Sequence, residues 1–65
     1  MFINNKYYIW YRSLIERAKQ RSTPKPSEVH HIIPKSLGGN DSAENLCRLT
    51  PREHFICHLL LTRFT

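Results

Sequence analysis

The sequence predicts a small α+β domain in which an amphipathic helix precedes two short strands and a second helix. Three observations support this prediction. An apolar stripe with helical spacing runs through residues 5–20, two β-type segments occupy residues 28–32 and 46–49, and a helix-start signal stands at residues 50–53. The order of these elements places a helix before a strand, loop, strand and helix.

The length of the chain limits how much of it can be buried. A 65-residue chain removes only about 60% of its unfolded surface from water, so its own core is marginally stable. Folds of this size usually need a disulfide, a metal ion or a partner. Cys47 and Cys57 are too few for a disulfide framework, and we expect two small buried thiols. Metal binding by histidine is therefore the favoured source of extra stability.

Residues 5–20 form the first predicted helix. We expect the three aromatic side chains of its apolar stripe to pack in the core, although aromatic rings can also stack on bases. Residues 21–27 form an extended linker, because Pro24 and Pro26 do not fit a regular helix. The predicted apolar stripe, at the i, i+3, i+4, i+7 spacing of one helix face, consists of Tyr7, Trp10, Tyr11, Leu14 and Ala18.

A loop that contains two adjacent glycines joins the two predicted strands. Residues 28–32 form the first strand, and Pro34 ends it. The loop covers residues 35–44, with the glycines as turn residues. Residues 46–49 form the second strand, which we expect to pair antiparallel with the first.

The second helix has a clear start. Thr50 is a good N-cap, Pro51 suits the first helical position, and Glu53 completes a capping box. His54 and His58 then share one face of this helix. The neighbouring face carries Phe55, Leu59 and Thr62.

The four histidines fall into two couples. His30 and His31 are adjacent on a strand and point to opposite faces, so one can bind a metal while the other has a different role. His54 and His58 lie four apart on a helix and can grip one ion together. One strand ligand and two helix ligands leave a coordination position open, which is typical of a catalytic metal site.

The residues around these histidines resemble the HNH endonuclease family, which is named for a histidine, an asparagine and a histidine. Here these would be His31, Asn45 and His54. The resemblance covers roughly residues 28–62 and extends to free-standing phage enzymes and the nuclease domain of DNase colicins. The segments that carry it are 28–34, 38–39, 44–46 and 50–54, with His58.

This resemblance implies a ββα-metal arrangement in residues 27–65, preceded by a basic helix and linker in residues 1–26 of one domain. It implies hydrolysis of phosphodiester bonds in DNA with one divalent metal. Its implied ligands are His30, His54 and His58. Three imidazoles favour zinc or nickel by affinity, whereas magnesium or manganese would support turnover.

Three further roles follow from the resemblance. His31 would be the general base that activates the attacking water. Asn45 would tie the loop to the strands and hold that base in place, although asparagine is also common in turns for local reasons. Glu28 would accept a hydrogen bond from a ligand histidine or orient an arginine toward phosphate, unless it is a plain surface glutamate.

The net charge of +5 comes from residues 1–26, which contain six basic side chains and only one acidic side chain, that of Glu16. A basic segment of this kind suits the binding of a polyanionic substrate. The same pattern is also found on a helix face that is simply exposed to solvent. The candidates for gripping DNA phosphates are Lys35, Arg48 and Arg52 in the motif, and Arg17, Lys19 and Arg21 in the basic segment.

We expect a cytoplasmic protein, in a bacterial host if a phage encodes it, that acts on DNA as a monomer without a membrane or a small-molecule cofactor. The start of the chain lacks the apolar core of a signal peptide, and no apolar run approaches the roughly 18 residues of a membrane span. No further DNA-binding module is visible before the chain stops at Thr65, so target specificity and the choice between nicking and double-strand cleavage stay open.

Three other readings stay open. The chain is a non-catalytic, zinc-stabilised DNA-binding module, a degenerate remnant or fragment of a nuclease, or a nuclease toxin that needs an immunity partner. The intact His31 argues against the first, because a purely structural metal site has no use for a base.

Overall fold

The computed structural model describes residues 5–65, and it confirms the predicted α+β class. Residues 1–4 lie outside the described residues. They are part of the predicted basic segment and of the start of the chain on which the prediction about a signal peptide was based. The regular elements are α1 (Lys6–Gln20), β1 (Glu28–His31), β2 (Leu46–Leu49) and α2 (Pro51–Phe64).

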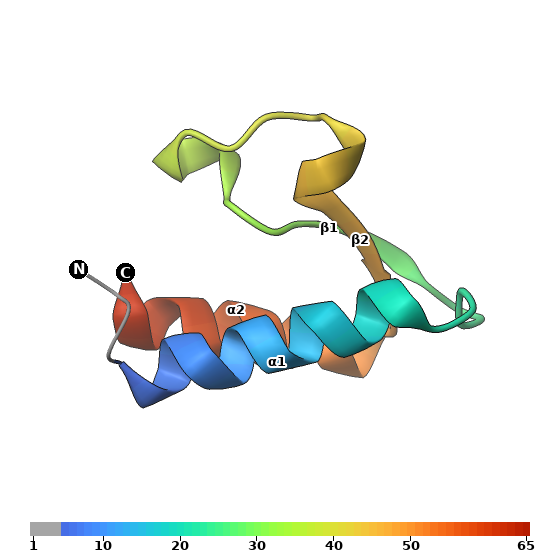
Figure 1. The fold of residues 1–65 in the computed structure, drawn as a ribbon, viewed down its shortest axis with the longest axis horizontal. Coiled ribbons are helices and arrows are strands. Elements are labelled where there is room, and N and C mark those ends of the chain that lie inside the picture. Colours follow the sequence, from blue (N-terminus) through green and yellow to red (C-terminus); the bar gives the residue numbers. More distant parts are fainter. Residues whose placement is uncertain (1–4) are drawn as a thin grey trace.

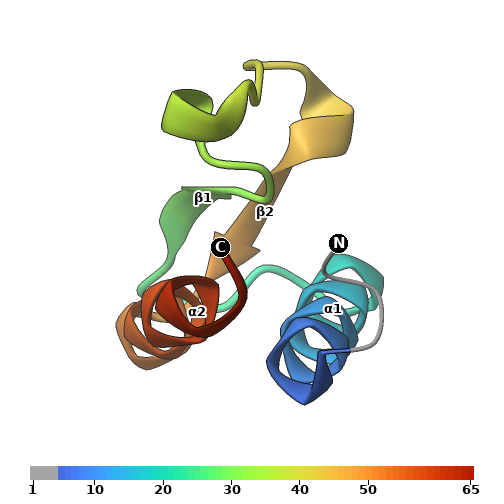
Figure 2. The same cartoon turned by 90° about the vertical axis from the view of Figure 1, so that its left-hand side faces the viewer.

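The two helices lie side by side in one layer, and the two-stranded sheet lies over them (Figure 1). The two helices run antiparallel, as two contacts between their ends show. Asn5, just before α1, donates to the Arg63 carbonyl near the end of α2, and Arg21, just after α1, pairs with Glu53 at the start of α2. The end-on view shows the layers most clearly (Figure 2). Within the described part of the chain, neither helix is both long and apolar enough to cross a membrane.

The buried line of α1 differs from the predicted stripe. Ile15 is fully buried, whereas Trp10 is 53% exposed and its ring packs edge-on against Tyr7 at the surface. The prediction for Trp10 was wrong because α2 and the sheet cover a face of α1 that is centred on Tyr11. The buried apolar side chains of the described residues are Tyr11, Ile15, Ala18, Ile32, Cys47, Leu49, Cys57 and Leu61.

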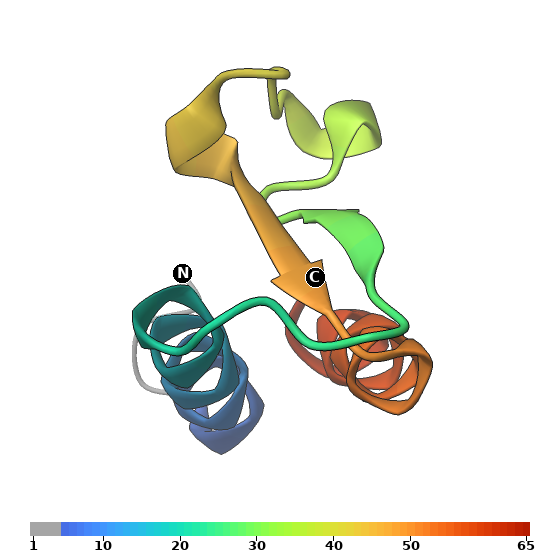
Figure 3. The same ribbon diagram turned by 90° about the vertical axis from the view of Figure 1, so that its right-hand side faces the viewer.

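The strands pair antiparallel, as predicted, with His30 opposite Cys47. The first strand is one residue shorter than predicted, since Ile32 lies beyond it, although its N–H still donates to the Asn45 carbonyl at 2.8 Å. The predicted loop contains two short 3₁₀ turns, at Lys35–Leu37 and Ala43–Asn45. The linker crosses from the end of α1 to the start of β1 (Figure 3).

The predicted capping box is present at the start of α2. The Thr50 hydroxyl accepts from the Glu53 N–H at 3.1 Å, and the Glu53 carboxylate accepts from the Thr50 N–H at 2.9 Å. The same carboxylate pairs with both terminal nitrogens of Arg21. The Arg21 hydrogen bond lowers the pKa of Glu53 from 4.5 to about 2, helped by its bonds to Thr50. One carboxylate therefore caps α2 and fastens the end of α1 to it.

We expect Glu53→Gln to lower the stability of the domain at neutral pH. Glutamine can still complete the capping box, so the substitution removes mainly the charge that pairs with Arg21. A carboxylate with a lowered pKa stabilises the folded state above its ordinary pKa and loses this contribution as protons bind. The difference in unfolding free energy between wild type and variant should shrink as the pH falls from 4.5 to about 2. Urea denaturation across that range measures it, and a difference that does not change with pH would contradict it.

Candidate active site

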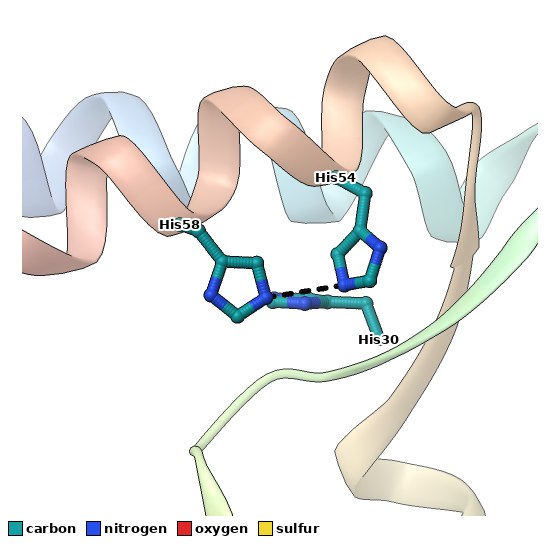
Figure 4. A group of neighbouring side chains, drawn as sticks. All are labelled: His30, His54 and His58. Atoms are coloured by element: carbon teal, nitrogen blue, oxygen red, sulfur yellow. Dashed lines mark hydrogen bonds between the residues drawn. The ribbon is translucent and has the colours of Figure 1, made fainter.

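Three histidines from two elements meet beneath the sheet. His30 comes from β1, and His54 and His58 lie one turn apart on α2 (Figure 4). One ring nitrogen from each lies within 4.8 Å of the others, and the Nε2 atoms of His54 and His58 are 3.2 Å apart. This grouping brings together the three residues whose spacing predicted a shared ion.

Glu28 orients the ring of His54 through the ring nitrogen that lies away from His58. The carboxylate of Glu28 lies 2.7 Å from Nδ1 of His54. An ionised carboxylate can only accept, so Nδ1 carries the proton and Nε2, on the side of His58, carries the lone pair. Of the two contacts expected for Glu28, the structure shows the one to a histidine that was predicted to be a ligand.

His30 is the buried member of the cluster, with 2% of its surface exposed. Burial, followed by the neighbouring His54 and His58, lowers the pKa of His30 to about 4. Its imidazole is therefore neutral near pH 7, which is the form that coordinates a metal. Its Nε2 lies 2.7 Å from the hydroxyl of Tyr11.

This donor set fits a divalent metal ion. It offers three imidazoles, and two of them have one ring nitrogen engaged by another side chain, as metal-ligating histidines usually do. Protein ligands from a strand and a helix leave room for water or substrate, because the cluster borders a cavity.

His31 borders the same cavity but has a different partner. Its Nε2 lies 2.7 Å from one carboxylate oxygen of Asp41 in the interstrand loop, and Lys35 lies 3.1 Å from the other. The hydrogen bond from His31, followed by Lys35, lowers the pKa of Asp41. The cavity, of about 360 Å³, is lined by Val29, His30, His31, Pro34, Lys35, His54 and His58.

The side chain of Asn45 holds the loop against the end of β1. Its amide accepts from the N–H of Ile33 at 2.8 Å and donates to the carbonyls of Ile33 and Asn40, at 3.0 and 2.8 Å. Two of these bonds span 12 residues, so they are long-range and not part of a local turn. A Cβ at Gly39 would lie 1.7 Å from the Ile33 carbonyl oxygen, so the loop closes only with glycine there.

The predicted DNA-binding residues differ in what they already contact. Arg21 is engaged by Glu53, Lys19 donates to the Glu44 carbonyl, and Lys35 pairs with Asp41. Within residues 5–65, no ion pair is made by the exposed side chains of Arg17, Arg48 and Arg52.

Two residues at the site were missed in the sequence. Asp41 contacts His31 across 10 residues, and Tyr11 contacts His30 across 19. An acidic residue in a polar turn carries no sign of its partner. Tyr11 did carry a signal, because a tyrosine predicted to be in the core needs a partner for its hydroxyl.

The sequence of the chain is similar to an endonuclease family and to phage proteins named as endonucleases. The sequence profile described as HNH endonuclease matches residues 16–63. The chain is 50% identical over 54 residues to probable mobile endonuclease E of Enterobacteria phage T4, across 82% of this chain and 38% of that protein. It is 48% identical over 58 residues to probable mobile endonuclease D of the same phage, across 82% of this chain and 22% of that protein.

A third relative is described as an uncharacterized 38.5 kDa protein in psbA intron 1 of Chlamydomonas moewusii, 43% identical over 47 residues, across 72% of this chain and 14% of that protein. No solved structure matches the chain significantly. The chain belongs to the HNH endonuclease family, which confirms the resemblance found in the sequence. It spans less than two fifths of the length of these phage relatives.

We expect Asn45→Ala to destabilise the domain by about 1–3 kcal/mol, because it leaves polar backbone groups at Ile33 without partners. Urea denaturation of the metal-free protein measures this loss. Asn40→Ala is the matched control, because the Asn40 side chain is exposed and bonds only to Ser42 nearby. Equal stability of the two variants would show that the long-range bonds of Asn45 contribute nothing.

Proposed function

We propose that this chain is a metal-dependent DNA endonuclease domain that hydrolyses phosphodiester bonds by direct attack of water. The observation that carries this proposal is the shared cavity, in which a three-histidine cluster and a separate histidine lie together. A nuclease needs both, since one group must activate water while another stabilises the charge that develops on the phosphate oxygens.

In this proposal each histidine has one task. His30, His54 and His58 hold the ion, whose identity among zinc, nickel, magnesium and manganese is open. When bound, a divalent ion supplies Lewis-acid stabilisation of the scissile phosphate and its 3′ leaving oxygen. His31 takes the proton from the attacking water, and the product carries a 5′-phosphate.

The contact between His31 and Asp41 supports the role of His31 as a base. Because Asp41 is ionised, it accepts a hydrogen bond from Nε2–H, and in the neutral ring the lone pair of His31 lies on Nδ1. A ring held in this way presents its acceptor nitrogen to water. Asp41 is thus a positioning residue for the base.

We assign substrate binding to Lys35 at the cavity and to three exposed arginines elsewhere on the surface. Lys35 lines the cavity directly, and its ammonium group is held beside His31 by Asp41. Arg17, Arg48 and Arg52 extend the positive surface with guanidinium groups that have no carboxylate partner in residues 5–65. Phosphate contacts of this kind give DNA affinity without reading the sequence. We propose cytoplasmic DNA as the target and a monomer as the acting form.

We expect His31→Ala to lower plasmid cleavage by about 10²–10⁴-fold while metal affinity is retained, because His31 is not a ligand in this proposal. The measurement is nicking of supercoiled plasmid with magnesium, manganese, nickel or zinc, and after removal of metal. His54→Ala is the companion variant, which should lose metal binding as well as cleavage. Full cleavage by His31→Ala would contradict the assignment. No cleavage by folded, metal-loaded wild type would favour a DNA-binding module or remnant.

We expect Asp41→Ala to lower kcat about tenfold without raising KM, because the imidazole of His31 loses the partner that orients it. The substitution removes a negative charge near DNA and frees the ammonium group of Lys35 from its ion pair, so substrate binding should not weaken and the two kinetic constants separate orientation from affinity. Glu44→Ala removes a charge from the same loop, and it controls for that electrostatic effect. The same kcat for both variants would contradict a positioning role for Asp41.

A further inference from the structure

We propose that Tyr11 positions the metal ligand His30 by holding the proton on Nε2, so that Nδ1 binds the ion. This inference rests on the proposed metal centre. It concerns a residue of α1 that precedes residue 16, where the match to the HNH family begins. A side chain outside the matched segment would then determine how a ligand inside it is presented.

The argument starts from the single proton of the Tyr11 hydroxyl. This hydroxyl lies 2.6 Å from the backbone carbonyl of Ile32 and 2.7 Å from Nε2 of His30. A carbonyl oxygen can only accept, so the hydroxyl proton points to Ile32. Nε2 of His30 must then be the donor to the phenol oxygen, and the lone pair of the ring lies on Nδ1.

The burial of both residues makes the hydrogen bond between Tyr11 and His30 decisive for the tautomer of His30. Tyr11 and His30 are each only 2% exposed, so water cannot replace either partner of the hydrogen bond. The two rings also meet edge to face, with centroids 5.9 Å apart. A buried ring whose Nε2–H loses its only partner pays a desolvation cost, which the other tautomer or a rotated ring would relieve. The Tyr11 hydroxyl removes that alternative.

The position of the hydroxyl is itself determined by packing. Tyr11 lies in the core with Ile15 and Leu61, and its ring is tilted against Phe64 at a centroid distance of 5.3 Å. His54 shows the mirror arrangement, with Nδ1 held by Glu28 and Nε2 directed toward His58. Two ligands of one ion are therefore oriented through opposite ring nitrogens by groups from different elements.

The test compares wild type with Tyr11→Phe, which removes the hydroxyl and keeps the ring. We expect the zinc affinity of the metal-free protein, measured by competition with a chromophoric chelator, to fall about 10–100-fold. Tyr7→Phe is the matched control, because it removes a hydroxyl from the same helix at a residue that contacts Trp10, Lys6 and Arg63 instead of the histidines. Its affinity should equal that of wild type.

A second measurement does not depend on the folding of the variant. In zinc-loaded wild type, ¹⁵N NMR of the histidine rings should show His30 coordinated through Nδ1 with its proton on Nε2. Coordination through Nε2, or an unchanged affinity in Tyr11→Phe, would overturn the role of Tyr11 and leave the metal centre intact. Absence of zinc binding in folded wild type would instead contradict the metal centre and, with it, this inference.

Discussion

The buried imidazole of His30 is the constraint on which the rest of this structure depends. A polar ring in the middle of so small a core is costly unless each of its nitrogen atoms has a partner. The neighbours of its ring come from both helices, with Tyr11 on α1 and His54 and His58 on α2, while the ring itself belongs to β1. The two helices and the sheet must therefore dock together for this one side chain to be satisfied.

The loop between the strands is held by a second set of constraints, although it contains little regular structure. Gly38 adopts a positive φ of 96°, and Gly39 lies against the Ile33 carbonyl where no side chain fits. Asn45 then closes the loop with hydrogen bonds to both polar backbone groups of Ile33. The result is that Asp41, an exposed residue, is held beside His31 by the backbone on either side of it.

Much of this arrangement was predictable because its signals are local. The capping box at Thr50, the strand at residues 46–49 and the four-residue spacing of His54 and His58 are each written within a few neighbouring residues. The exposure of Trp10 was not predictable, because periodicity locates a stripe only to within about one residue and the docking of α2 selects which side is covered. The contacts of Tyr11 with His30 and of Asp41 with His31 join segments that are distant in the sequence, and a single sequence does not show which distant segments meet.

The reach of Tyr11 across the domain has a consequence for which part of the chain can be exchanged as one unit. Here a segment bounded by residues 16–63 would leave behind the hydroxyl that holds His30. A unit that keeps this contact is then longer than the matched segment, and a new N-terminal helix would have to supply an equivalent hydroxyl for Nε2 of His30.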